Sequence, residues 1–227
     1  MIILSIDTSQ AASVALVDTD SRTVLASEQA DDQGRHLEFI GPALARVLAN
    51  PVQPDLVVTG IGPGPFTGLR VGIAAGIAVG QARGIPVKGL LSQAAIAEEL
   101  HRRNAQAAGP VLIAADARRK EVYFSVYESS DASLQAGPFV AKPAEVAEVL
   151  AAHGHTAVTV RLGRGFMLYP DVLGDSSFPS IVDPRAEYLA FAAARELRAG
   201  HELAEPVPEY LREPDAKSPP ARESRLK

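Results

Sequence analysis

The sequence predicts an α/β fold made of two related halves, each a mixed β-sheet with flanking helices. β-rich segments alternate along the chain with longer segments whose apolar residues recur at helical spacing, which is typical of this fold class. One pattern also occurs twice: a strand that ends in an aspartate, a short turn and a second strand, first around Asp7 and again around Asp116. A repeated pattern of this size indicates a duplicated domain.

The first half is expected to begin with an antiparallel meander of strands at residues 2–6, 14–17 and 24–27. A helix follows at residues 36–50, in which Pro42 should either introduce a kink or mark the true start. A strand at residues 56–61 leads through a glycine-rich turn into a long helix that Gly84 ends. Ser92 is expected to cap a further helix that ends near residue 104.

The second half is expected to contain strands at residues 111–115, 122–127 and 157–162 and helices at residues 143–153 and 184–199. The repeat divides the chain into an N-terminal domain at residues 1–108 and a C-terminal domain at residues 109–212. Residues 213–227 combine prolines with charged residues, a composition that predicts a disordered tail.

The stretch "GIGPGPFTGLRVGIAAGIAVGQARG", residues 60–84, first suggests a phosphate-binding loop that leads into a helix. Its spacing fits neither the dinucleotide-binding pattern nor the P-loop, because Thr67 stands where a third glycine is needed and no Gly-Lys-Ser/Thr triplet is present. Pro63 and Pro65 also lack the N–H groups that would bind a phosphate. The turn is therefore expected to be rigid, with Thr67 as the N-cap of the helix.

Glycine recurs at every fourth position of this helix, at residues 68, 72, 76, 80 and 84, and so forms one row along its length. Each interior glycine costs about 1 kcal/mol relative to alanine, a cost that close approach to another element would offset. Residues 71–80 include no polar side chain, so the helix should be buried on all sides. Two interpretations remain open: a central helix of its own domain, or a helix shared with a second protein chain.

Composition excludes several classes of function. The chain of 227 residues has a net charge of −5, so independent tight binding to nucleic acid is not expected. It has no cysteine, which excludes disulfides, thiolate nucleophiles and cysteine-based metal sites. The N-terminal "MIILSIDTSQ" lacks a charged leader, and the apolar helix is shorter than the roughly 20 residues of a membrane span. We expect a cytoplasmic protein without membrane contact.

Three segments, "GPGPFTGLRVGIAAGIAVG", "IDTS" and "RHLEFIGPAL", together closely resemble the TsaB (YeaZ) family, and "DARRKEVYFSVY" and "PEYLREPDA" extend the match over most of the chain. The resemblance implies two lobes of the actin-like (ASKHA) superfamily. It also implies a non-catalytic dimerisation subunit that binds and activates TsaD, which transfers threonylcarbamoyl to N6 of adenosine 37 in tRNAs reading ANN codons. TsaE would join a ternary complex, and tRNA would bind only through the complex. For the chain alone, a homodimer and a monomer both stay open.

In that family the helix after the position of His36 and the glycine-rich helix form the surface that contacts TsaD or a second copy, so the resemblance favours the shared-helix interpretation. The residues that it places in the interface are His36, Ile40, Leu44, Gly68, Arg70, Gly72, Ile73, Gly76 and Gly80. Arg70 stands in the first turn of its helix, where the dipole disfavours a cation, so it is expected to pair with a carboxylate, from this chain or from a partner.

Asp7 and Thr8 are candidates for a vestigial nucleotide or metal contact, because Asp7 ends the first strand where nucleotide-binding relatives place a metal-associated aspartate. The alternative role for Asp7 is to cap its own turn. His36 is expected to make a polar contact at the interface or to stand at a helix end, since Ile40 occupies the position where a second histidine would complete a metal-binding pair. No metal site, cofactor or catalytic residue is predicted.

Two other functions stay open. A small-molecule kinase or acyltransferase would use Asp7 and a nucleotide held between the two lobes. A peptidase would need a nucleophile–base pair or a metal cluster, and the sequence indicates neither.

Overall fold

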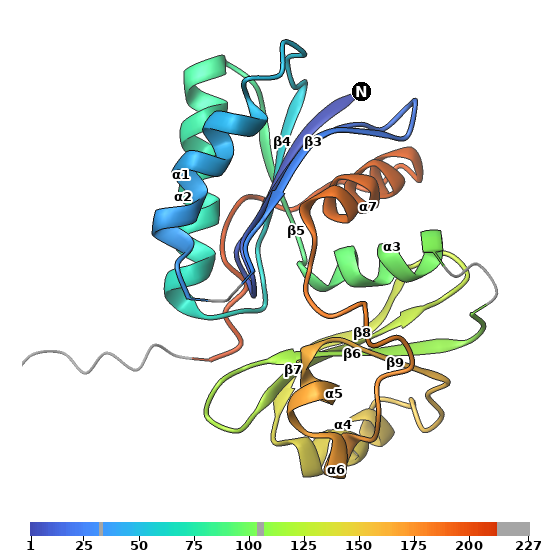
Figure 1. Cartoon of the computed structure of the whole chain (residues 1–227). Helices are drawn as coiled ribbons and strands as arrows, with labels where there is room; N and C mark the ends of the chain where they lie inside the picture. Colours follow the sequence, from blue (N-terminus) through green and yellow to red (C-terminus); the bar gives the residue numbers. More distant parts are fainter. Residues whose placement is uncertain (32–33, 104–106, 213–227) are drawn as a thin grey trace, which may run out of the picture.

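The structure, a computed structural model, describes residues 1–31, 34–103 and 107–212. It contains two mixed β-sheets separated by a pair of helices (Figure 1). The predicted tail at residues 213–227 and the predicted helix end near residue 104 lie outside the described residues.

The first sheet has the strand order β3-β2-β1-β4-β5, and β1, β2 and β3 form the predicted antiparallel meander. β4 and β5 continue the sheet in parallel. Its strands are β1 (Ile2–Asp7), β2 (Ser13–Asp18), β3 (Thr23–Gln29), β4 (Leu56–Gly60) and β5 (Val87–Leu90).

The second sheet has the order β8-β7-β6-β9 and repeats this arrangement, with an antiparallel meander followed by a parallel strand. Its strands are β6 (Pro110–Asp116), β7 (Val122–Glu128), β8 (Leu134–Ala141) and β9 (Val160–Leu162). Asp7 and Asp116 end the equivalent strands β1 and β6, so the duplicated α/β fold is confirmed. Strand β8 was not predicted, because it contains Gly137 and Pro138, residue types that are uncommon inside strands.

The helices agree with the sequence prediction in most places. They are α1 (His36–Val47), α2 (Phe66–Arg83), α3 (Gln93–Arg103), the 3₁₀ helix η1 (Pro143–Glu145), α4 (Val146–Ala152), α5 (Arg164–Leu168), α6 (Pro170–Leu173) and α7 (Ala186–Arg198). α1 begins at His36 and continues through Pro42, so Pro42 does not mark its start. Helix α2 ends at Gly84 in the left-handed conformation, as predicted.

The N-cap of α2 was predicted wrongly. The cap residue is Pro65, in an extended conformation, and Thr67 already lies inside the first turn of the helix. Pro65 fits this position because its ring allows the extended backbone conformation of a cap and an N-cap needs no N–H of its own.

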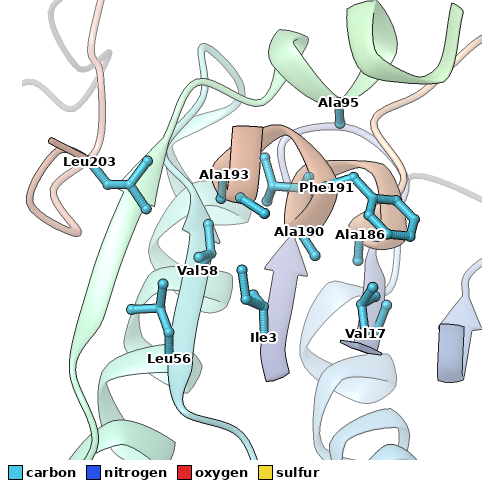
Figure 2. Close-up of a cluster of buried hydrophobic side chains, with 13 residues drawn as sticks. Ile3, Val17, Leu56, Val58, Ala95, Ala186, Ala190, Phe191, Ala193 and Leu203 are labelled. Carbon is cyan, nitrogen blue, oxygen red and sulfur yellow. The ribbon is translucent and has the colours of Figure 1, made fainter. Parts of the chain in front are cut away.

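The elements form layers (Figure 1): α1 and α2 cover one face of the first sheet and α7 covers the other. Helix α3 packs between α7 and the second sheet, and α4 and α5 pack on the far face of that sheet. Figure 2 shows the core between α7 and the first sheet, where the small side chains Ala186, Ala190 and Ala193 let the helix approach Ile3 and Val58 closely.

The start of α7 is also fixed to the first sheet by hydrogen bonds. The Ser5 hydroxyl donates to the carbonyl of Ala186 at 2.6 Å, and the N–H of Ala186 donates to the Ser13 hydroxyl at 2.9 Å. A helix from the C-terminal half of the sequence therefore completes the core of the first sheet. The domain boundary between residues 108 and 109 stays a prediction.

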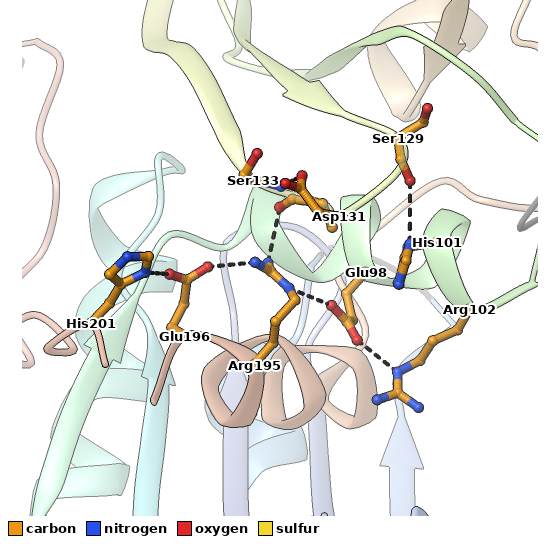
Figure 3. A network of polar contacts seen from close by, with 10 residues as sticks. Glu98, His101, Arg102, Ser129, Asp131, Ser133, Arg195, Glu196 and His201 are labelled. Carbon is orange, nitrogen blue, oxygen red and sulfur yellow. Dashed lines mark hydrogen bonds and ion pairs between the residues drawn. The ribbon is translucent and has the colours of Figure 1, made fainter. Parts of the chain in front are cut away.

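A buried polar network joins α3, α7 and the turn before β8 (Figure 3). The carboxylate of Glu98 is 2% exposed. One of its oxygens accepts from Arg102 Nε at 2.7 Å and the other from Arg195 Nε at 3.0 Å. Arg195 also donates to the carbonyl of Ala132 at 2.9 Å. Because a buried charge must be paired, this network fixes how the two sheets sit against each other.

Replacing Glu98 with alanine should lower the free energy of unfolding by about 2–3 kcal/mol, somewhat less than for a fully buried pair because both arginines keep partial solvent contact. Urea denaturation measures the change. The control is Glu38→Ala, which removes the exposed Glu38–Arg35 pair and should change stability by no more than about 0.5 kcal/mol. Equal effects of the two substitutions would show that the network does not hold the sheets together.

Candidate functional site

Asp7 is fully buried at the end of β1. Its Oδ1 accepts hydrogen bonds from the N–H of Ser9 at 2.8 Å and from the Ser9 hydroxyl at 2.7 Å. Its Oδ2 has no partner of full hydrogen-bond geometry, although the Ser92 hydroxyl lies near enough to favour the ionised form. A Cβ at Gly60 would overlap Oδ2, so the strand beside Asp7 requires glycine there. In this structure Asp7 caps its own turn, which is the alternative role that the sequence left open.

Burial raises the pKa of Asp7 above its ordinary value of 3.8. Hydrogen bonds from Ser92 and Ser9 oppose the rise, and the carboxylate of Asp183 adds to it. The charged form of Asp7 is therefore costly in the folded state.

The space between the two lobes near Asp7 is closed. The cavity there has a volume of only about 10 Å³. Its lining residues are Ser9, Gln10, His36, Pro65, Asp116 and Arg118. The amide of Gln10 donates to the carbonyl of Asp116 at 3.1 Å and so joins the two strand-end loops. Small-molecule sites usually have volumes of several hundred Å³, so this cavity is too small for a nucleotide as it stands. A neighbouring pocket of about 220 Å³ shares Pro65 and Arg118 with it.

The glycine row of α2 faces the first sheet of the same chain. A Cβ at Gly72 would overlap Thr8 Oγ1, one at Gly76 would overlap Thr59 Cγ2, and one at Gly80 would overlap Val87 Cγ2. The Thr8 hydroxyl donates to the carbonyl of Gly68 at 2.7 Å and accepts from the N–H of Gly72 at 3.1 Å. Thr8 is therefore a structural contact between β1 and α2.

This arrangement corrects part of the predicted interface. Of the residues assigned to it, Ile40, Gly68, Gly72, Ile73, Gly76 and Gly80 are buried within this chain. The row was expected to let a second chain approach, but β-branched side chains of the chain's own strands fill that side of the helix. A partner that binds to α1 and α2 would have to contact other residues of these helices.

His36 and Leu44 are both partly buried. The Nε2 of His36 donates to the carbonyl of Gln10 at 2.7 Å, and His36 is the first residue of α1, the helix-end position that the sequence predicted as one of two roles. Leu44 packs against the core between α1 and the sheet.

The outer face of α1 and α2 is mostly apolar and small. Leu37 is 75% exposed, and Gly41 has no atom within 4 Å of the position of a Cβ. Ala74 and Ala78 are the matching exposed residues of α2. The sequence prediction missed these four positions, although their helical phase carries the signal: Ile40, Ala43 and Val47 define the buried face of α1, and Leu37 and Gly41 fall outside it.

Arg70 lies at the edge of this face, and within the described residues of this chain it pairs with a tyrosine instead of the predicted carboxylate. A carboxylate from a partner chain stays a prediction. The Nε of Arg70 donates to the Tyr210 hydroxyl at 2.8 Å, and its guanidinium lies 5.7 Å from the centre of the Tyr210 ring. Phe66 stacks on Tyr210, with ring centres 4.3 Å apart. The segment that precedes residue 213 thus packs on the start of α2.

Two features are absent from the described residues. Within residues 1–31, 34–103 and 107–212, no three histidine or carboxylate side chains lie together as metal ligands would. In the same part of the chain, no helix has both the length and the apolar character needed to cross a membrane.

Comparison with known proteins identifies the family. The sequence model of the family described as "TsaD: tRNA N6-adenosine threonylcarbamoyltransferase" matches residues 26–219. The Escherichia coli K12 protein named "tRNA threonylcarbamoyladenosine biosynthesis protein TsaB" is 34% identical, and the match covers 93% of this chain and 95% of that protein. The chain belongs to the TsaB family. The resemblance seen in the sequence is therefore confirmed.

A solved structure agrees with the TsaB assignment. The solved structure titled "YeaZ from Pseudomonas aeruginosa" has a TM-score of 0.71 at 26% identity, over 92% of this chain and 99% of that chain. An uncharacterized protein of Mycobacterium leprae is 40% identical over 64% of this chain, and the match spans 40% of that protein. The TsaB fold thus extends over almost the whole chain.

Replacing Gly72 with alanine should lower the free energy of unfolding by about 1–3 kcal/mol, because the new Cβ overlaps Thr8 Oγ1 inside a packed contact. The control is Gly41→Ala, where the Cβ meets open space and better helix propensity should raise stability by up to about 1 kcal/mol. Thermal or urea denaturation measures both. Equal stability of the two variants would contradict the contact between α2 and β1.

Replacing Asp7 with asparagine should make the chain more stable at pH 7, because the folded-state pKa of Asp7 lies above the unfolded value. The folded chain therefore binds the Asp7 proton more tightly than the unfolded chain does. The native chain loses stability as pH rises from 3.8 through the raised pKa, and the asparagine variant does not. Urea denaturation between pH 4 and pH 7 should show a difference between the two proteins that grows with pH. A difference that is constant or of opposite sign would disprove the raised pKa.

Proposed function

We propose that this chain is the non-catalytic partner subunit of TsaD and holds TsaD in its active arrangement. TsaD would transfer threonylcarbamoyl to N6 of adenosine 37 in tRNAs that read ANN codons. The proposal starts from membership of the TsaB family, whose E. coli protein is named for tRNA threonylcarbamoyladenosine biosynthesis. The observation that supports it is the apolar outer face of α1 and α2.

That face suits contact with another pair of helices. Leu37 offers an exposed apolar side chain, and Gly41, Ala74 and Ala78 leave room for a second helix to approach. An exposed glycine inside a helix costs about 1 kcal/mol relative to alanine, and no contact within the described chain accounts for Gly41. A sequence model described as TsaD matches this chain, so TsaD would present a related helix pair and form a pseudo-symmetric interface.

The lack of catalysis is supported by the inter-lobe region. Asp7 is buried, and the cavity beside its turn has a volume of about 10 Å³. TsaD would supply the metal, bind the threonylcarbamoyl-adenylate and perform the transfer.

TsaE would join the assembly as a third, ATP-hydrolysing subunit. The tRNA would bind to the assembly, and the complex would work in the cytoplasm. The chain alone would form a homodimer through the same face.

Replacing Ala74 with arginine should abolish assembly with TsaD, because a long charged side chain would stand in the centre of the proposed interface. Light scattering after size exclusion measures the mass of the chain alone and mixed with TsaD from the same organism. The native chain should give a 1:1 heterodimer, and the variant should give separate subunits at micromolar concentration. The control is Ala147→Arg, the same change at an exposed position of α4.

Assembly that survives Ala74→Arg would show that the partner surface lies elsewhere. ATP turnover by the isolated chain that disappears in Asp7→Asn would favour the kinase or acyltransferase alternative instead of the subunit role.

A further inference from the structure

An open groove of about 440 Å³ lies between α3, α7 and the turn that joins β2 to β3. Its lining side chains are Arg22, Glu98, His101, Arg102, Arg195 and Arg198. Figure 3 shows part of this wall, with Glu98 between Arg102 and Arg195 and with His101 one turn away. We call it the arginine groove.

Cations outnumber anions in the arginine groove. Glu98 is the one carboxylate among the lining residues, and both of its oxygens are already paired with Arg102 and Arg195. Arg195 uses its remaining nitrogens on Glu196 and on the carbonyl of Ala132. These contacts satisfy Arg195. Of the other arginines, Arg102 shares Glu98 with Arg195, Arg198 pairs with Asp20, and Arg22 has no carboxylate partner among the described residues.

Three arginines retain free donors toward the groove. Arg102 donates to Glu98 only through Nε, and Figure 3 shows its two terminal nitrogens without a contact, while its guanidinium lies 3.7 Å from the centre of the Phe191 ring. Arg198 is 53% exposed, and one terminal nitrogen, Nη2, donates to the carbonyl of Thr19 at 2.8 Å and contacts Asp20, which also pairs with the N-terminal ammonium group. Its Nε and other terminal nitrogen have no partner among the described residues. Arg22 is exposed and has no hydrogen bond or ion pair with any described residue.

Helix dipoles explain only part of this cluster. Arg102, Arg195 and Arg198 stand in the last turns of α3 and α7, where cations are favoured. Arg22 belongs to no helix. Its φ of 59° is a backbone conformation that favours glycine. The turn between β2 and β3 thus brings the guanidinium of Arg22 to the groove formed by α3 and α7.

We propose that the arginine groove binds backbone phosphates of the tRNA substrate, an inference that rests on the proposed function. Guanidinium groups donate two parallel hydrogen bonds to phosphate oxygens. Arginines from three elements would bind neighbouring phosphates of one strand. Because the chain carries a net charge of −5, this positive groove would also decide which side of the chain tRNA approaches.

The groove stays open in the proposed complex. Helices α1 and α2 cover one face of the first sheet, and α7 covers the opposite face (Figure 1). TsaD bound to α1 and α2 would therefore leave α7 and α3 uncovered, so tRNA could touch this subunit while its adenosine 37 reaches TsaD.

The test uses the complex of the full chain with TsaD and compares the native chain with Arg22→Gln/Arg198→Gln. The control is Lys142→Gln/Arg161→Gln, which removes the same charge from exposed positions outside the groove. Assembly is measured first by light scattering, and tRNA binding is then measured by fluorescence anisotropy at several salt concentrations. The groove variant should bind tRNA more weakly, and its slope of log K against log salt should be smaller by about two, one for each lost phosphate contact. The control should match the native complex.

Each outcome decides the question. Unchanged affinity and slope in a variant that still assembles would overturn the groove as a tRNA contact. Binding of inorganic phosphate to the groove arginines, combined with unchanged tRNA binding by the groove variant, would also overturn the proposal. It would indicate a small-anion site. Failure of the native chain to assemble with TsaD would refute the proposed function instead, and the same titration of the chain alone would then decide whether the groove binds tRNA.

Discussion

Along its glycine row, helix α2 contributes no side chains to its contact with the first sheet, and the structure of the N-terminal lobe depends on this close contact. Thr8, Thr59 and Val87 fill the space above the glycine row, and the Thr8 hydroxyl bonds to the backbone of the helix. The three interior glycines cost roughly 3 kcal/mol in helix propensity, and the packing and hydrogen bonds of this contact offset that cost. At the end of β4, Gly60 lies directly against the carboxylate of Asp7, which is fully buried.

The second sheet is joined to this lobe through helices. Helix α7 returns from the end of the sequence to cover the first sheet, and α3 lies between α7 and the second sheet. Glu98 on α3 and Arg195 on α7 place their paired charges where the sheets meet. Because Glu98 is buried and loses a partner for its charge if Arg195 moves away, the pair disfavours other relative positions of the two lobes. A rigid relation between the lobes agrees with a subunit that supports a partner more than with an enzyme that opens and closes around a nucleotide.

The packing also decides which surfaces are free. With its glycine side against the sheet, α2 turns Ala74 and Ala78 outward beside Leu37 and Gly41 of α1. On the opposite side of the sheet, α7 and α3 bring their C-terminal arginines together with Arg22. The chain thus has one apolar face and one basic groove on opposite sides, an arrangement that allows a protein partner and a polyanion to bind at the same time.

The sequence by itself determined the duplicated α/β fold, most of the elements and the family, because strand and helix periodicities and the glycine motif are local patterns. It did not determine the orientation of α2. A row of small residues fits a strand surface and a second chain equally well. The β-branched side chains that fill it here come from the residue after β1 and from β4 and β5, segments on both sides of α2 in the sequence. The role of Asp7 was likewise decided by tertiary contacts, since Gly60 and Ser92 enclose it only after β4 and α3 are in place. Local periodicity shows which residues share a face, but burial depends on distant segments, and only the tertiary structure brings those together.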